Sequence, residues 1–266
     1  MEVTIFGLGG EGVLRTFGRQ REATALIERA LALGINYFES ARAYAGSESY
    51  LGAALGERRR DIFLTSKTAE RDAGGALRDL ETTLRNLRTD YLDLWQFHDL
   101  RDEAEWQRAQ RPDGALAAMR RAQQEGKVRF VGVTGHHDPR LLAQAIEEFD
   151  FDTVLLPVSA AEAHYRAFRE ITIPAAQAKG MGIVGMKTLA RGLLVDPRRG
   201  LTAGRLLQFA LSQPVSLVTV GCDDVAQLEE NVAAAAAFQP LSDQEQAELL
   251  ALTRPFARQA VYYRPR

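Results

Sequence analysis

The chain has 266 residues, of which 46% are hydrophobic and 26% charged, and its formal net charge at pH 7 is −2. This is the composition of an ordinary globule long enough for one barrel of about 250 residues, and the charge argues against a general nucleic-acid or anionic-membrane surface. The single cysteine, Cys222, excludes an internal disulfide, a cysteine zinc site and an iron–sulfur cluster held by four thiolates.

The first half of the chain alternates strand-like and helix-like patterns. Strands are predicted over residues 3–8, 35–38, 62–66 and 92–97. Helices are predicted over residues 22–33, 47–56, 75–87 and 114–125. A polar insert around Trp106 separates the fourth strand from its helix. Successive strand ends are roughly thirty residues apart, the length of one strand and one covering helix.

The second half repeats this scheme. Strands are predicted over residues 128–133, 153–156, 182–186 and 215–220. Helices are predicted over residues 138–149, 165–179, 202–211 and 226–238. The first of these helices opens on Asp138-Pro139, which is typical of an N-cap followed by proline in the first turn.

Eight strands, each with a helix, predict an α/β fold, a (β/α)8 TIM barrel. Residues 242–252 open on a capping-box-like Ser-Asp-Gln-Glu and predict an extra C-terminal helix. No long linker or low-complexity tract divides the chain, so residues 1–266 are predicted to form a single domain. We expect a cytoplasmic protein outside membranes, because there is no charged-then-apolar leader and no apolar run of about 18 residues.

Proton-transfer side chains stand at three successive strand ends. These side chains are Glu39, Lys67 and His98, and Tyr44 follows Glu39 by five residues. A parallel barrel places the carboxyl ends of all its strands on one face, where its active site lies. Any one of these residues alone is more often solvated or structural, but their coincidence predicts a proton-transfer site in one pocket.

Glycines at positions 7, 9 and 12 fit the Gly-x-Gly-x-x-Gly fingerprint of a dinucleotide-binding doubly wound sheet. No helix opens directly after them, because residues 15–20 are polar and include a glycine. The acidic residue expected about 20 positions later is also missing, since Glu28 lies in mid-helix. We therefore interpret these glycines as a tight turn at the mouth of a barrel strand.

The pair His136-His137 raises the question of metal binding. Adjacent histidines are expected to point in different directions, and no third ligand is in sequence register, so no metal site is predicted. Cys222 is expected to be inert.

Four segments resemble the aldo-keto reductase family. Residues 34–44 read Gly-Ile-Asn-Tyr-Phe-Glu-Ser-Ala-Arg-Ala-Tyr, similar to the family's Gly-Ile-Asn-Tyr-Phe-Asp-Thr-Ala-x-x-Tyr, and the family's following Ser-Glu is matched at residues 47–48. Phe-Leu-Thr-Ser-Lys at 63–67 and Asp-Tyr-Leu-Asp-Leu-Trp-Gln-Phe-His at 90–98 match its lysine and histidine strands. Gln-Leu-Glu-Glu-Asn at 227–231 resembles the segment that helps hold the adenosine part of the cofactor.

The resemblance implies a barrel that binds NADP or NAD without a Rossmann fold and reduces an aldehyde or ketone, a small-molecule carbonyl substrate, to an alcohol. Tyr44 would be the general acid that protonates the carbonyl oxygen as hydride arrives from the reduced nicotinamide. A free phenol has a pKa of about 10, and the ammonium of Lys67 would lower it. Glu39 would hold Lys67 by an ion pair, and His98 would orient the carbonyl.

The resemblance also assigns the cofactor-binding positions. These are Gly9, Gly10, Thr134, Gly135, Met186, Lys187, Gly192, Leu193, Gln227, Glu230 and Asn231. Several positions depart from the family pattern. Glu39 replaces the usual aspartate, and the amides that hold the nicotinamide carboxamide are replaced by residues 134–135 and by Leu155. Gln227 stands where an arginine often holds the adenosine 2′-phosphate, with Asp223 and Asp224 close by, so NADH is predicted to bind at least as well as NADPH.

Two alternatives stay open at this level. One is a non-catalytic nicotinamide-nucleotide-binding regulatory protein on the same fold, which the altered carboxamide positions favour and the strand-end residues disfavour. The other is a redox-neutral lyase or isomerase that uses Tyr44 and Lys67 on another carbonyl compound. No nucleic-acid or membrane partner is expected, and the protein is expected to be a monomer or a weak homo-oligomer.

Overall fold

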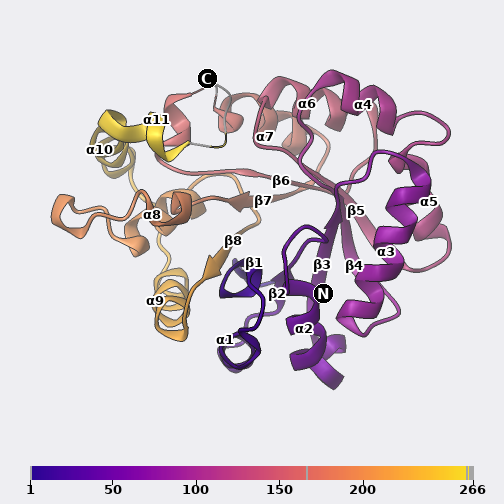
Figure 1. The fold of residues 1–266 in the computed structure, drawn as a ribbon. Coiled ribbons are helices and arrows are strands. Elements are labelled where there is room, and N and C mark those ends of the chain that lie inside the picture. The colour runs from indigo at the N-terminus through magenta and orange to yellow at the C-terminus, as the bar shows by residue number, and fades with distance from the viewer. Residues whose placement is uncertain (1, 166, 262, 264–266) are drawn as a thin grey trace.

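The computed structural model describes residues 2–165, 167–261 and 263. In this part of the chain eight parallel strands close into a barrel in chain order, with β8 pairing back to β1 (Figure 1). The strands are β1 (Phe6–Gly12), β2 (Tyr37–Glu39), β3 (Phe63–Thr68), β4 (Leu92–Phe97), β5 (Val128–Thr134), β6 (Thr153–Pro157), β7 (Gly182–Met186) and β8 (Leu217–Cys222). The (β/α)8 barrel expected from the sequence is confirmed.

Helices surround the barrel, with at least one after each strand (Figure 1). They are α1 (Gln20–Ala32), α2 (Ser47–Leu55), α3 (Ala73–Leu87), α4 (Glu103–Ala109), α5 (Ala115–Gln124), α6 (Pro139–Glu148), α7 (Phe168–Ala178), α8 (Ala203–Leu211) and α9 (Val225–Ala236). Asp138 caps α6 as expected, accepting a hydrogen bond from the Arg140 amide. Within the described residues, no helix combines the length and apolar character needed to cross a membrane.

The extra C-terminal helix expected from the sequence is α10 (Asp243–Thr253), and α11 (Ala257–Ala260) follows it. Ser242 and Glu245 form a capping box that satisfies amide groups at the start of α10. Gln213, just after α8, donates to the Gln246 side chain on α10 at 3.0 Å. The Gln213–Gln246 hydrogen bond links α10 to the chain just after α8, outside the barrel (Figure 1).

Side chains of the strands alternate between the covering helices and the barrel interior. Phe38 belongs to the main core between strands and helices, whereas Tyr37 belongs to a second cluster inside the barrel. The other fully buried members of that interior cluster are Leu155, Val184 and Leu217. Glu39 lies two residues after Tyr37 and so shares its interior face, toward the carboxyl end. The apolar cluster thus leaves the carboxyl end for polar side chains.

Gly7 and Gly9 lie inside β1, so the interpretation of these glycines as a turn at the strand mouth is wrong for these two positions, and Gly10 lies in the same strand. A Cβ on Gly7 would lie 2.5 Å from Tyr37 Cδ1, and a Cβ on Gly10 would lie 2.7 Å from Ser47 Oγ. Glycine is needed here because β1 approaches β2 and the start of α2 too closely for any side chain. Gly12, with a φ of 66°, does mark the turn that ends the strand.

The insert around Trp106 is a helix, α4, rather than an irregular polar segment. Asp102 caps this helix by accepting a hydrogen bond from the Glu105 amide. The Trp106 ring is buried, and its Nε1 donates to Glu148 Oε2 at 2.6 Å. Seven residues are too few for a helical hydrophobic pattern to stand out, so this element depends on its cap and one buried indole.

Candidate active site

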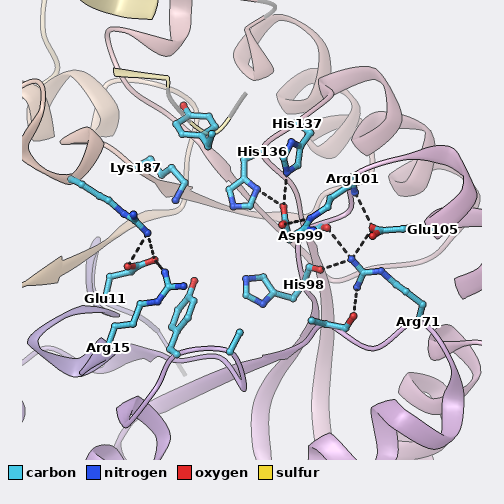
Figure 2. A pocket seen from close by; sticks show the side chains of 15 residues that line it. Glu11, Arg15, Arg71, His98, Asp99, Arg101, Glu105, His136, His137 and Lys187 are labelled. Carbon is cyan, nitrogen blue, oxygen red and sulfur yellow. Dashed lines mark hydrogen bonds and ion pairs between the residues drawn. The ribbon is translucent and has the colours of Figure 1, made fainter. Parts of the chain in front are cut away.

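A cavity of about 410 Å³ opens at the carboxyl ends of the strands (Figure 2). It is lined by Glu11, Arg15, Ala43, Tyr44, Ala69, Arg71, His98, Asp99, Arg101, Glu105, His136, His137, Lys187, Arg191 and Tyr263. Its volume suits a small-molecule site, and its position is the one that barrel enzymes use. Most of its lining is charged or can be charged.

Two of the four residues predicted to transfer protons, Tyr44 and His98, line this cavity. The other two, Lys67 and Glu39, are buried next to Tyr44. Lys67 Nζ lies 2.5 Å from Glu39 Oε1 and donates to the carbonyl oxygen of Ser40 at 2.8 Å. The Tyr44 and His98 rings line the cavity edge to face, with their centroids 5.7 Å apart. Lys67 Nζ lies 4.8 Å from the centre of the Tyr44 ring, so a buried ion pair underlies the phenol.

The loop after β2 is fixed by hydrogen bonds that place Tyr44. The Tyr44 carbonyl accepts from the Ser47 amide at 2.8 Å. Glu48 is 1% exposed and accepts from the hydroxyls of Ser66 on β3 and Thr83 on α3. The Ser-Glu pair at residues 47–48 therefore ties the start of α2 to its neighbours and holds the loop that carries Tyr44.

Burial sets the protonation of the phenol and the ammonium. Burial raises the pKa of Tyr44 well above its usual value of 10.0, and the negative charges of Glu39 and Glu11 raise it further. Burial also lowers the pKa of Lys67, although the ion pair with Glu39 opposes this shift. In this structure the pKa of Tyr44 is therefore not lowered as expected, because desolvation of the phenolate and the nearby carboxylates outweigh the positive charge of Arg15. Tyr44 keeps its proton at neutral pH.

His98 faces the cavity as a neutral imidazole. Burial lowers its pKa well below 6.5, and the positive charge of Lys67 adds to this effect. Its main chain is held in place because its carbonyl oxygen accepts from Arg71 Nη2 at 3.0 Å. A neutral imidazole can donate one hydrogen bond to a substrate oxygen without adding charge to the site.

Glu39 reaches Lys67 despite being one methylene longer than the aspartate usual in the family, so the backbone accommodates the change. We expect Glu39→Asp to withdraw the carboxylate by about 1 Å and to lower kcat roughly tenfold to a hundredfold. Steady-state kinetics and thermal melts would measure this. Glu125→Asp, at an exposed ion pair after α5, is the matched control and should change neither quantity. If the Glu39→Asp enzyme kept the original kcat, the claim that the backbone is adapted to the longer Glu39 side chain would be contradicted.

The predicted carboxamide positions lie at the ends of β5 and β6. Thr134 is 1% exposed, and its Oγ1 accepts from the Asp99 amide at 2.8 Å. Gly135 is buried beside it, and Leu155 belongs to the apolar interior cluster. Gly9, another predicted position, is buried in β1, as is the neighbouring glycine. Among the predicted carboxamide positions, Thr134 is thus the one with a polar side chain. Its hydroxyl accepts one hydrogen bond and keeps a proton that it can donate.

The predicted positions on α9 do not line the cavity. Gln227 and Glu230 are exposed, and Gln227 Oε1 accepts from the Asp223 amide at 3.0 Å. Asn231 is 4% exposed and contacts Cys222 Sγ at 3.6 Å through its Nδ2. Burial raises the pKa of the Cys222 thiol to about 12, which agrees with an unreactive cysteine. Asn231 therefore packs α9 onto β8.

The loop after β7 brings two cations to the cavity. Lys187 follows Met186 at the end of β7, and burial lowers its pKa although Glu11 opposes the shift. Arg191 Nη2 lies 3.4 Å from both carboxylate oxygens of Glu11 on β1. The predicted positions 192–193 follow Arg191 and are exposed at this side of the mouth.

The sequence interpretation missed several charged residues of the cavity. Asp99 Oδ2 accepts from Arg101 Nε at 2.8 Å, and Arg71 pairs with Glu105 at 2.8 Å (Figure 2). Their signal was available, because Arg71, Asp99 and Arg101 lie in the loops directly after β3 and β4. Glu105 lies in α4, the helix that follows β4. Charged residues in such loops face the active-site end of a barrel.

His136 and His137 do not diverge as expected but converge on Asp99 (Figure 2). His136 Nδ1 and His137 Nε2 lie 2.5 and 3.2 Å from the same oxygen, Asp99 Oδ1. The rings are nearly perpendicular, at 81°, yet both reach the loop after β4. Asp99 is a third potential ligand beside the two histidines, contrary to expectation. It comes from the neighbouring strand end, which sequence register could not show.

The barrel, the cavity at its carboxyl end and the tyrosine, lysine, glutamate and histidine grouped there define the class as a barrel oxidoreductase. The model of the aldo/keto reductase family matches residues 5–201, so the chain belongs to this family. Aldo-keto reductases use NADP(H) and act on small-molecule carbonyl substrates.

Relatives agree with this assignment. The chain is 28% identical to the L-galactose dehydrogenase of Arabidopsis thaliana, over 92% of this chain and 88% of that protein. It is 27% identical to the glyoxal reductase of Bacillus subtilis, over 74% of this chain and 67% of that protein. An aldo-keto reductase from Klebsiella pneumoniae, solved in complex with NADPH, has a TM-score of 0.76 at 23% identity, with 94% of this chain and 91% of that chain covered. At that identity the structural likeness shows the fold alone.

Proposed function

We propose that the protein is an NAD(P)H-dependent reductase that converts an aldehyde or ketone to an alcohol, with Tyr44 as general acid. The observation that carries this proposal is the Tyr44 phenol above the buried Lys67–Glu39 ion pair, beside a neutral His98. When bound, the reduced nicotinamide supplies hydride to the carbonyl carbon. Tyr44 gives its proton to the carbonyl oxygen, where negative charge develops.

The other three residues support that proton transfer. Lys67 keeps a positive charge close to the phenol, and this charge favours the phenolate that remains after the proton has left. Glu39 fixes the ammonium in place at 2.5 Å. His98 donates a hydrogen bond that orients the carbonyl oxygen, which limits the substrate to a reactive arrangement.

The residues at the mouth of the cavity fit a nicotinamide dinucleotide. Lys187 and Arg191, on the loop after β7, would bind its diphosphate by charge-assisted hydrogen bonds, at the end of the barrel where phosphates are commonly held. The hydroxyl of Thr134 would donate to the carboxamide in place of the missing amides.

The lining of the cavity indicates a polar substrate. Its apolar part consists of two alanines and the rings of Tyr44 and Tyr263, whereas Arg71, Asp99 and Arg101 supply charge. A hydrophobic substrate would displace water from these groups without replacing its hydrogen bonds. Sugars and small oxo-aldehydes would replace those bonds, and the names of the two curated relatives, which refer to L-galactose and glyoxal, support this class.

We expect NADH to bind at least as tightly as NADPH. Asp223 and Asp224 are exposed before α9, and Asp224 caps that helix through the Gln227 amide. Two carboxylates therefore lie close to Gln227, the position that the resemblance assigns to the 2′-phosphate. Arg191 pairs with Glu11, and Arg199 pairs with Asp196. Repulsion between the two carboxylates before α9 and the 2′-phosphate, reduced by solvent and salt, should weaken the binding of NADPH by about tenfold. Dissociation constants of both cofactors at one ionic strength would measure it, and a tenfold preference for NADPH would contradict it.

Cofactor titration followed by a screen of carbonyl compounds for cofactor oxidation tests the proposal as a whole. Binding together with saturable oxidation supports a reductase. Binding without oxidation by any compound supports the non-catalytic regulatory alternative. We further propose that residues 1–266 act as one domain that is monomeric or weakly associating, which light scattering after size-exclusion chromatography would test.

A further inference from the structure

Three potential metal ligands form one wall of the catalytic cavity. Asp99, which directly follows His98, lies between His136 and His137, and we call these three residues the Asp99 cluster (Figure 2). One potential ligand atom from each residue lies within 4.8 Å of those of the other two. Asp99 Oδ1 is the oxygen that both imidazoles contact. The three side chains are 13%, 16% and 26% exposed, so they are shielded from bulk water but open toward the cavity.

The contact between His136 and Asp99 is not an ordinary hydrogen bond. Nδ1 and Oδ1 are 2.5 Å apart, closer than the roughly 2.7 to 3.2 Å of N–H···O bonds. Both atoms are shielded from solvent, and neither has a partner with hydrogen-bond geometry among the described residues. A cation shared by Nδ1 and Oδ1 would satisfy both atoms together.

We propose that the Asp99 cluster binds one divalent transition-metal ion of the zinc class. Two imidazoles and one carboxylate form the ligand set of open zinc and iron sites, whereas magnesium and calcium prefer oxygen ligands alone. Ligands about 2.0 to 2.1 Å from a tetrahedral zinc lie roughly 3.3 Å from one another. The 3.2 Å contact of His137 already fits this spacing, and the His136 ring must withdraw by less than about 1 Å.

Neighbouring groups hold the carboxylate in place for this role. Asp99 has a φ of 58°, and its amide donates to Thr134 Oγ1 while its carbonyl oxygen accepts from Arg71. Its second carboxylate oxygen, Oδ2, accepts from Arg101 at 2.8 Å, which leaves Oδ1 for the ion. Such outer contacts orient metal ligands. The remaining coordination positions of the ion would face the cavity and would accept oxygen atoms of a polar substrate.

The test is a titration of tag-free, full-length protein, first dialysed against a chelator, with zinc chloride and separately with cobalt chloride. Calorimetry should show one zinc ion per chain, and cobalt should give the visible absorption of a four- or five-coordinate site. His136→Gln and His137→Gln should each weaken zinc binding by at least about tenfold. His164→Gln is the matched control, because His164 is not among the residues that line the cavity and its Nε2 contacts the carbonyl of Leu250.

Circular dichroism and thermal melts would establish that each variant folds, and His137→Gln, at the more exposed ring, serves if His136→Gln does not fold. Absence of stoichiometric zinc binding to the wild type would overturn the proposal. So would binding that survives both substitutions, or binding that His164→Gln weakens equally. Because the readout is metal binding and not turnover, this result is independent of whether the protein reduces a carbonyl.

Discussion

Tyr44→Phe is expected to reduce kcat for carbonyl reduction by a factor of at least roughly a thousand while leaving the dissociation constant of the cofactor nearly unchanged. The hydroxyl is needed only where charge develops on the substrate oxygen, so its loss affects the transition state and not cofactor binding. The ring remains, and with it the edge-to-face contact with His98. Single-turnover kinetics and cofactor titration on the same preparation would measure both quantities.

The matched control for this change is Tyr91→Phe. Tyr91 lies near the start of β4, outside the cavity, where its ring packs against the Arg59 guanidinium. This variant should keep the kcat of the wild type. If Tyr44→Phe also kept it, another group would have to supply the proton, and Tyr44 would lose its proposed role.

Lys67→Met is expected to lower kcat by roughly a hundredfold or more. Burial and the charge of Glu39 already raise the pKa of Tyr44. The Lys67 ammonium lies 4.8 Å from the centre of the Tyr44 ring, and a positive charge at that distance favours the phenolate. Without it the phenol becomes a still weaker acid, so proton donation slows. In the reverse reaction, where Tyr44 must be ionised to accept a proton, the pH needed for alcohol oxidation should therefore move upward. The pH dependence of both directions would measure this, and an unchanged profile would contradict the role of Lys67.

A loss of folding could imitate that result, since Lys67→Met leaves Glu39 buried without a partner. The double variant Lys67→Met/Glu39→Gln removes the unpaired carboxylate and should recover much of the lost stability in a thermal melt. Its kcat should remain low, because the ammonium is still missing. Recovery of both quantities together would mean that the pair serves folding alone.

Most of the strands and helices could be predicted from local patterns in the sequence. Alternation of short apolar runs with helical stripes repeats at the barrel's spacing, and caps such as Asp138 mark the helix starts. The same regularity explains why Glu39, Lys67 and His98 could be placed together, since strand ends share one face of a barrel. Helix α4 could not be recognised this way, because one buried side chain, Trp106, accounts for most of its packing.

Contacts between loops could not be predicted from the sequence. The convergence of His136 and His137 on Asp99 depends on the path of two loops that are far apart in the chain, and no local pattern encodes it. The role of the β1 glycines could not be predicted from local pattern, because their close approach to Tyr37 and Ser47 involves residues at least 30 positions away. The pKa of Tyr44 depends on burial, which residue types alone do not give.

Transfer of deuterium tests the central claim most directly, namely that this cavity reduces a carbonyl group. The protein would be incubated with NADPH carrying deuterium at both C4 positions and with the sugars and oxo-aldehydes of the screen, and the products would be identified by mass spectrometry. The proposed function predicts an alcohol with one deuterium on the former carbonyl carbon, formed by the wild type and not by Tyr44→Phe. A product of unchanged mass would indicate an isomerase, and no product at all despite cofactor binding would contradict the assignment of a catalytic reductase.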